Sequence, residues 1–159
     1  LGPAYERGEL TRAEFLGRLR GILGYTGPDE DLARAWQDIF SPNRPMWELV
    51  DRLRGRLPLY LLSNTNCLHH DHLVDEYEVF GRFDDGVFSY RVGMSKPEPG
   101  IFELAVRQFG VRPGATVYID DLAANVEAAR AAGLLAFHYD AARHADLLGW
   151  LRALGVQSV

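Results

Sequence analysis

The stretch TVYIDDLAANVEAARAAG, residues 116–133, decides the fold of this chain. Its apolar first part, residues 116–119, is typical of a strand that is covered on both faces, and Asp120 and Asp121 follow it directly. The alanine-rich part then predicts a helix over 123–132 that ends at a glycine. A covered strand that leads through acidic residues into a helix is the building block of a parallel sheet with crossover helices.

Similar segments lie on both sides of this stretch. Short apolar runs over 59–62 and 134–137 predict two more covered strands, and residues 86–90 predict a weaker one. Helices are predicted over 100–109 and 143–154. The alternation predicts an α/β fold, a Rossmann-type parallel sheet with helices on both faces. In such sheets, ligands bind beyond the carboxyl ends of the strands.

The first third of the chain is predicted to be helical. Thr11 and Glu14 have the spacing of a capping box, and apolar residues follow them at helical intervals. A breaker with two prolines over 41–45 then interrupts the helical pattern. We therefore divide the chain into a helical part, residues 1–45, and an α/β core, residues 46–159.

Composition excludes several classes of protein. The 159 residues are 47% hydrophobic and 25% charged, which suits one domain with a sizeable core. A net charge of -5 without a basic stripe argues against nucleic acid as a partner. Cys67 is the only cysteine, and neither a secretory signal nor a membrane span is expected. The expectation is a soluble cytoplasmic protein without a membrane partner; the sequence leaves the oligomeric state open.

Lys96 is the only lysine among the seventeen basic side chains. Lysine is a compact charge on a flexible stem, whereas arginine is a planar fork. Pro97 and Pro99 restrict the backbone around Lys96. This pattern favours a tight site in which one ammonium meets one phosphate or carboxylate oxygen; the alternative is a lysine retained by chance at a turn.

Polar groups follow two of the predicted strands. Asp120 and Asp121, with Asn125 one helical turn later, suit Mg²⁺ held together with a substrate phosphate. The alternative is a helix start that carries acids for capping. Ser63 and Asn64 offer hydroxyl, amide and backbone donors to a phosphate. The alternative interpretation is that Ser63 and Asn64 belong to an ordinary turn.

The three histidines near residue 70 suggest zinc only weakly. His69, His70 and His72 do not share one helical face, and a single cysteine lies nearby. We expect one of them to face the mouth of a site and the others to be solvated.

The order of these signals resembles the haloacid dehalogenase superfamily in its phosphatase branch. The segments LSNTN at 62–66, GMSKPEP at 93–99 and YIDD…N…AAG within 118–133 resemble the second, third and fourth motifs of that family. The segment ERGELT at 6–11 resembles the helical cap of a bacterial subgroup, the glucose-1-phosphate phosphatase type. The resemblance implies a small helical cap inserted near the N-terminus of the α/β core.

The resemblance also implies roles for the candidate residues. Ser63 would hydrogen-bond the transferring phosphoryl group, and Lys96 would neutralise its charge, so both would be catalytic. Asp120 and Asp121 would hold Mg²⁺ directly or through water, supported by Asn125. The implied activity is Mg²⁺-dependent hydrolysis of a small phosphorylated metabolite such as a sugar phosphate.

One family element is missing from its expected place. The family has an Asp-x-Asp motif before the cap, whose first aspartate becomes an aspartyl-phosphate, on a strand between those that end at Ser63 and Asp120. No such motif precedes the cap-like helices here, so roughly 20–50 residues would be absent. Taken literally, the chain lacks its nucleophile and is expected to be inactive. A sequence that begins late, a fragment, a non-catalytic phosphate-binding relative and a phosphomutase all stay open.

Overall fold

Three helices form one end of the molecule in the computed structural model, which describes residues 1–157 and 159. They are α1 (Gly2–Glu6), α2 (Arg12–Leu23) and α3 (Asp29–Gln37). The predicted capping box at the start of α2 is confirmed, since both of its hydrogen bonds are present. The helix ends at Gly24, whose φ of 62° is left-handed and suits glycine.

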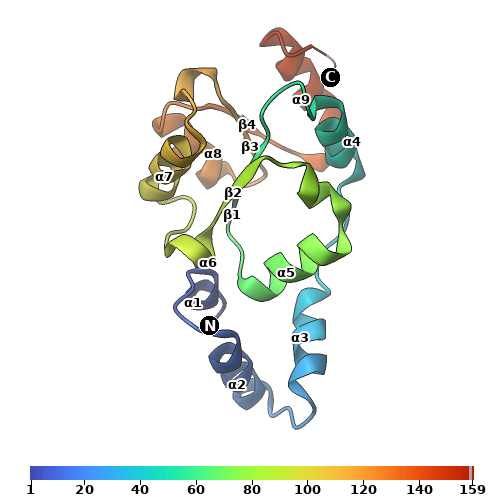
Figure 1. Ribbon diagram of the computed structural model, residues 1–159, viewed down its shortest axis with the longest axis vertical. Coiled ribbons are helices and arrows are strands. Elements are labelled where there is room, and N and C mark those ends of the chain that lie inside the picture. Colours follow the sequence, from blue (N-terminus) through green and yellow to red (C-terminus); the bar gives the residue numbers. More distant parts are fainter. Residues whose placement is uncertain (158) are drawn as a thin grey trace.

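An apolar cluster holds these helices together and joins them to the core. Tyr5 and Phe15 stack with their ring centroids 4.0 Å apart. The other buried members are Leu16, Leu32, Ala33 and Leu68, the last of which belongs to α5 (Cys67–Glu76). Because Leu68 lies in this cluster, the helical end packs directly on the rest of the molecule (Figure 1).

The rest of the chain alternates helices and parallel strands, as predicted. Its other elements are α4 (Arg44–Leu53), β1 (Tyr60–Ser63), β2 (Asp85–Phe88), α6 (Ser89–Val92), α7 (Pro99–Phe109), β3 (Val117–Asp120), α8 (Ala123–Ala131), β4 (Leu135–His138) and α9 (His144–Ala153). Short 3-10 turns cover 78–82, 113–115 and 141–143. Among the described residues, no helix combines the length and apolar character needed to span a membrane.

The strand predicted over 86–90 is shorter than expected. It ends at Phe88, and α6 begins at Ser89. The buried Ser89 hydroxyl accepts a hydrogen bond from Thr65 N and donates one to Thr65 O. These bonds hold Ser89 against the loop that follows β1, so the chain turns where the apolar pattern alone predicts that the strand continues.

The strands form two separate parallel pairs. β1 pairs with β2 from Tyr60 to Ser63, and β3 pairs with β4 from Val117 to Asp120. Within the described part of the chain, β1 and β3 do not pair with each other. This division agrees with the expectation that a central strand is missing between them.

Burial corrects one prediction about the strands. The apolar runs predict strands covered on both faces, yet all of β1 and the first three residues of β3 are only half-buried. In the described part of the chain each strand has one hydrogen-bonded neighbour instead of two, so its second edge and part of its side chains stay open.

Helices cover both faces of the strands, as predicted (Figure 1). On one side, α7 and α8 pack against β2 and β4 through Val87, Ile101, Phe102, Val126, Ala129 and Ala136. On the other, α4 and α9 share a cluster of Leu49, Leu53, Tyr139, Leu147 and Leu151. Both clusters include side chains from the strands, so buried apolar area rather than main-chain pairing holds the two strand pairs in place.

Candidate functional site

The ammonium group of Lys96 bridges the ends of β1 and β3. It donates one hydrogen bond of 2.8 Å to the main-chain oxygen of Leu62 and one of 2.7 Å to Oδ2 of Asp120. The two charged side chains are 10% and 6% exposed, so solvent screens this ion pair weakly. An ammonium has three donors, and one is left for a further acceptor.

Four donors surround the carboxylate of Asp120. Oδ2 accepts from Lys96 and from the hydroxyl of Tyr118 at 2.6 Å. Oδ1 accepts from the main-chain N–H of Leu122 and from Nδ2 of the buried Asn125, both at 2.9 Å. Burial by itself raises the pKa of Asp120, but the hydrogen bonds from Lys96 and Tyr118 outweigh it, and the net pKa lies below its usual value. Asp120 is therefore ionised at neutral pH.

Tyr118 also belongs to the site, although no role was predicted for it. Its hydroxyl donates to Asp120, and its ring lies 5.7 Å from Nζ of Lys96. Burial, the hydrogen bond to Asp120 and the charge of Asp120 raise the pKa of Tyr118, so the phenol stays protonated. Strand periodicity is the sequence signal that could have identified Tyr118, since Tyr118 and Asp120 are two residues apart in a strand and so point to the same face.

Asp121 differs from its neighbour. Its side chain is exposed, and its carboxylate has no hydrogen-bond or ion-pair partner in the described part of the chain. Its main-chain oxygen accepts a 2.9 Å hydrogen bond from Nε2 of His138, which holds the turn after β3 against the end of β4. The Asp121 carboxylate is consequently free to meet a cation.

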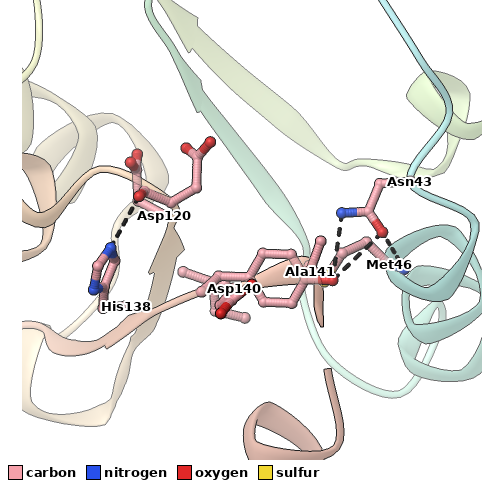
Figure 2. A pocket seen from close by; sticks show the side chains of 9 residues that line it. Asn43, Met46, Asp120, His138, Asp140 and Ala141 are labelled. Atoms are coloured by element: carbon pink, nitrogen blue, oxygen red, sulfur yellow. Dashed lines mark hydrogen bonds between the residues drawn. The ribbon is translucent and has the colours of Figure 1, made fainter. Parts of the chain in front are cut away.

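An open pocket of about 630 Å³ lies beside the two aspartates. Figure 2 shows Asp120 and His138 on one side of it and Asn43 and Met46, at the start of α4, on the other. The hydroxyl of Tyr139 lies 3.3 Å from Nδ2 of Asn43 and ties the two sides together.

Ser63 and Asn64 lie at the carboxyl end of β1. Among the described residues, the Ser63 hydroxyl makes only a long 3.5 Å contact with the oxygen of Asn64, so it can donate to another acceptor. The Asn64 side chain is engaged, because Nδ2 donates to the Lys96 oxygen and Oδ1 accepts from the Lys96 N–H, both at 2.8 Å. Of the donors predicted at Asn64, only the main-chain N–H is left for a phosphate.

The expectation that two of the three histidines are solvated is wrong for His69. This side chain is 6% exposed and stacks on Trp36 at a centroid distance of 5.6 Å. Its Nε2 bonds the Trp36 oxygen, and burial lowers the pKa of His69, so the ring is neutral at pH 7. Helical spacing could not show this, since the covering ring comes from α3.

The carboxylates suit a magnesium ion that also binds a phosphate. The described residues contain no cluster of three or more histidine, cysteine or acidic side chains that could hold a metal. Zinc normally requires such a cluster, whereas Mg²⁺ is usually held by one or two carboxylates with substrate phosphate and water. The exposed carboxylate of Asp121, directly after the carboxylate that pairs with Lys96, matches the second arrangement.

Comparison with known proteins gives consistent matches. Residues 9–133 match the model of the haloacid dehalogenase-like hydrolase family. The chain is 27% identical to the D-ribitol-5-phosphate phosphatase of Bacteroides thetaiotaomicron over 83% of its own length and 68% of that protein. It is 26% identical to the sesquiterpene phosphatase astK of Aspergillus oryzae over 84% of its length and 69% of that protein.

Solved structures agree with these matches. A haloacid dehalogenase family enzyme of Bacteroides thetaiotaomicron in complex with magnesium and inorganic phosphate superposes with a TM-score of 0.80 at 30% identity, covering 87% of this chain and 73% of that one. A predicted hydrolase of the same kind from Porphyromonas gingivalis gives a TM-score of 0.79 at 26% identity, covering 97% and 78%.

Proposed function

Because the chain belongs to the haloacid dehalogenase-like hydrolase family, we propose that it is the phosphate- and Mg²⁺-binding part of a phosphatase that acts on a small phosphorylated metabolite. One observation carries this proposal: the nearly buried ammonium of Lys96 is shared between the end of β1 and Asp120, and the residue that follows Asp120, Asp121, has an exposed carboxylate. The phosphatases among the relatives support the same class of reaction.

The proposed residues bind and orient the phosphoryl group. The third N–H of Lys96, the hydroxyl of Ser63 and the main-chain N–H of Asn64 donate to its oxygens. Mg²⁺, when bound, neutralises further charge on those oxygens. In the mechanism that the family implies, an aspartate outside these 159 residues would attack phosphorus, the P–O ester bond would break and the leaving oxygen would take up a proton, and water would then hydrolyse the aspartyl-phosphate to free phosphate.

Asp121, rather than Asp120, is the proposed direct ligand of the metal. Four donors already occupy the two oxygens of Asp120, whereas the carboxylate of Asp121 is exposed and has no partner in the described part of the chain. In this assignment Asp120 and Asn125 do not bind the metal directly. Asn125 donates to the carboxylate of Asp120, and that carboxylate holds the Lys96 ammonium in place.

The proposed division at residue 45 gives the helical part the role of a cap. Residues 1–45 would cover the phosphate site and select the group attached to the phosphate. A sugar or polyol phosphate is the proposed substrate class, since the relative from Bacteroides thetaiotaomicron is a D-ribitol-5-phosphate phosphatase.

The replacement Asp121→Asn is expected to weaken Mg²⁺ binding in the presence of inorganic phosphate. The loss of Mg²⁺ affinity should exceed the roughly 10–100-fold that is typical when a residue hydrogen-bonded to a metal ligand is removed, because a direct charged ligand is lost here. Isothermal titration calorimetry measures it. Asp140→Asn is the matched control, since Asp140 lines the same pocket and caps the following turn through Ala142. An unchanged titration in Asp121→Asn would refute the assignment.

A phosphate-release screen tests the function itself. The protein supplied with its Asp-x-Asp strand is incubated with Mg²⁺ and a panel of sugar, polyol and nucleotide monophosphates. Release from sugar or polyol phosphates supports the proposal. Phosphate binding without release would favour a non-catalytic binding module, and transfer to a second hydroxyl would favour a phosphomutase.

A further inference from the structure

We propose that Asn64 is a positioning residue that holds the loop of residues 93–99 so that the Lys96 ammonium reaches the phosphate site. This inference rests on the proposed function for its purpose, and its test does not depend on turnover. It changes the role expected for the Asn64 side chain from binding phosphate to orienting the residue that binds phosphate.

Two hydrogen bonds of opposite sense carry the inference. Nδ2 of Asn64 donates to the oxygen of Lys96, and the N–H of Lys96 donates to Oδ1 of Asn64, each at 2.8 Å. One hydrogen bond would fix a distance and allow rotation about it. The planar Asn64 amide here binds the N–H and the C=O on the two sides of the Lys96 Cα, which also fixes orientation, so the direction in which the Lys96 side chain leaves the backbone is set.

The segment at the end of β1 therefore contacts Lys96 at both ends. Asn64 holds its backbone, and the main-chain oxygen of Leu62 accepts from its ammonium at 2.8 Å. A lysine side chain has several rotatable bonds, and freedom in its backbone would multiply the positions open to the charge. Holding both ends confines the ammonium to the gap between β1 and β3.

The side-chain contacts of Glu98 hold this loop more weakly. Glu98 accepts from the N–H of Ser95 at 3.2 Å and pairs with Arg7, but the Arg7 and Glu98 side chains are 36% and 42% exposed. Solvent screens such a pair strongly. The half-buried Asn64 contacts thus join the main chain of the loop to the end of β1, in addition to the bond from the Lys96 ammonium to Leu62.

The reactivity of the single lysine tests the inference in the chain as it exists. Acylation of Lys96 by a limiting amount of acetic anhydride is followed by peptide mass spectrometry, which separates it from the α-amino group. The Lys96 side chain is 10% exposed, and the wild type should react slowly. In Asn64→Ala, the loss of both hydrogen bonds should accelerate acylation about tenfold.

Asn66→Ser is the matched control. Asn66 lies in the same loop, and its Oδ1 caps α5 through the N–H of His69 without touching Lys96. Serine keeps a capping oxygen and removes the amide, so the acylation rate of Lys96 should stay at the wild-type value. Circular dichroism confirms that each variant is folded. If Asn64→Ala does not fold, Asn64→Asp takes its place, because it keeps the side-chain volume and the bond to the Lys96 N–H. Lys96 in Asn64→Asp should be acylated faster than in the wild type.

The outcomes separate this inference from the proposed function. An acylation rate in the Asn64 variants equal to wild type overturns the positioning role, whether or not phosphate binds. Acceleration in the Asn66 control as well would show general loosening and also overturn it. Acceleration confined to the Asn64 variants supports it. If inorganic phosphate with Mg²⁺ then fails to protect Lys96 in the wild type, the proposed function fails while the positioning role stands.

Discussion

Replacing Lys96 by arginine is expected to lower kcat/KM for phosphate release by roughly 10²–10³-fold, although the charge is kept. The ammonium meets the Leu62 oxygen and Asp120 at 2.8 and 2.7 Å in a site where its side chain is 10% exposed. A planar guanidinium is wider and presents its donors in a fixed fork, so it cannot keep both contacts and still direct a third donor at the phosphate. Phosphate release by the protein supplied with its nucleophile measures the effect.

Arg107→Lys is the control for this exchange. Arg107 is exposed on α7, away from the site, and the same change of cation there should leave kcat/KM as it is. The comparison separates geometry from charge. Hydrolysis near the wild-type rate in Lys96→Arg would remove Lys96 from the phosphate site, and with it the observation on which the proposed function depends.

Asp120→Asn is expected to lower the free energy of unfolding at pH 7 by about 3 kcal/mol. The new amide removes the counter-charge of a nearly buried ammonium. It also cannot satisfy the four donors that surround the carboxylate. Urea denaturation measures the change. Asp121→Asn is the matched control: its carboxylate is exposed and without a partner in the described part of the chain, so unfolding should change by less than about 0.5 kcal/mol.

The variant Asp120→Asn should also change how the free energy of unfolding depends on pH in the acid range. The pKa of Asp120 in the folded protein lies below its ordinary value of 3.8, so the unfolded chain takes up this proton first as the pH falls. The stabilisation from Asp120 is therefore complete above that ordinary value and is lost as the pH falls through the lower pKa of the folded state. The difference in the free energy of unfolding between wild type and Asp120→Asn should become smaller in that pH range. A constant difference from pH 7 to pH 2 would contradict the ionised state assigned to Asp120.

Local signals predicted most elements because they depend on neighbours in the chain. The capping box of Thr11 and Glu14 and the left-handed Gly24 and Gly110 mark helix ends through contacts within one turn. Short apolar runs located β1, β3 and β4 to within a residue or two. The error in the length of β2 has the opposite origin, since Ser89 bonds to Thr65, 24 residues away.

The candidate site was predictable in its members and not in their roles. Ser63, Asp120 and Asp121 were selected because they follow predicted strands, and Lys96 was selected because it is the only lysine of the chain. Which carboxylate is occupied and which is free depends on Tyr118 and on the approach of Lys96. Neither can be read from a pattern of residue types.

The sequence by itself determined the alternating elements, the helical start and the set of polar groups at the carboxyl ends of the strands, because periodicity, capping and residue chemistry act over a few neighbouring residues. Only the tertiary structure decided that Asn64 holds Lys96 from 32 positions away, that four donors occupy Asp120, and that β1 and β3 each keep an edge unpaired within the described part of the chain. Those features depend on how separate elements pack, and the packing comes from apolar area, which is non-directional and does not specify which polar atoms will meet.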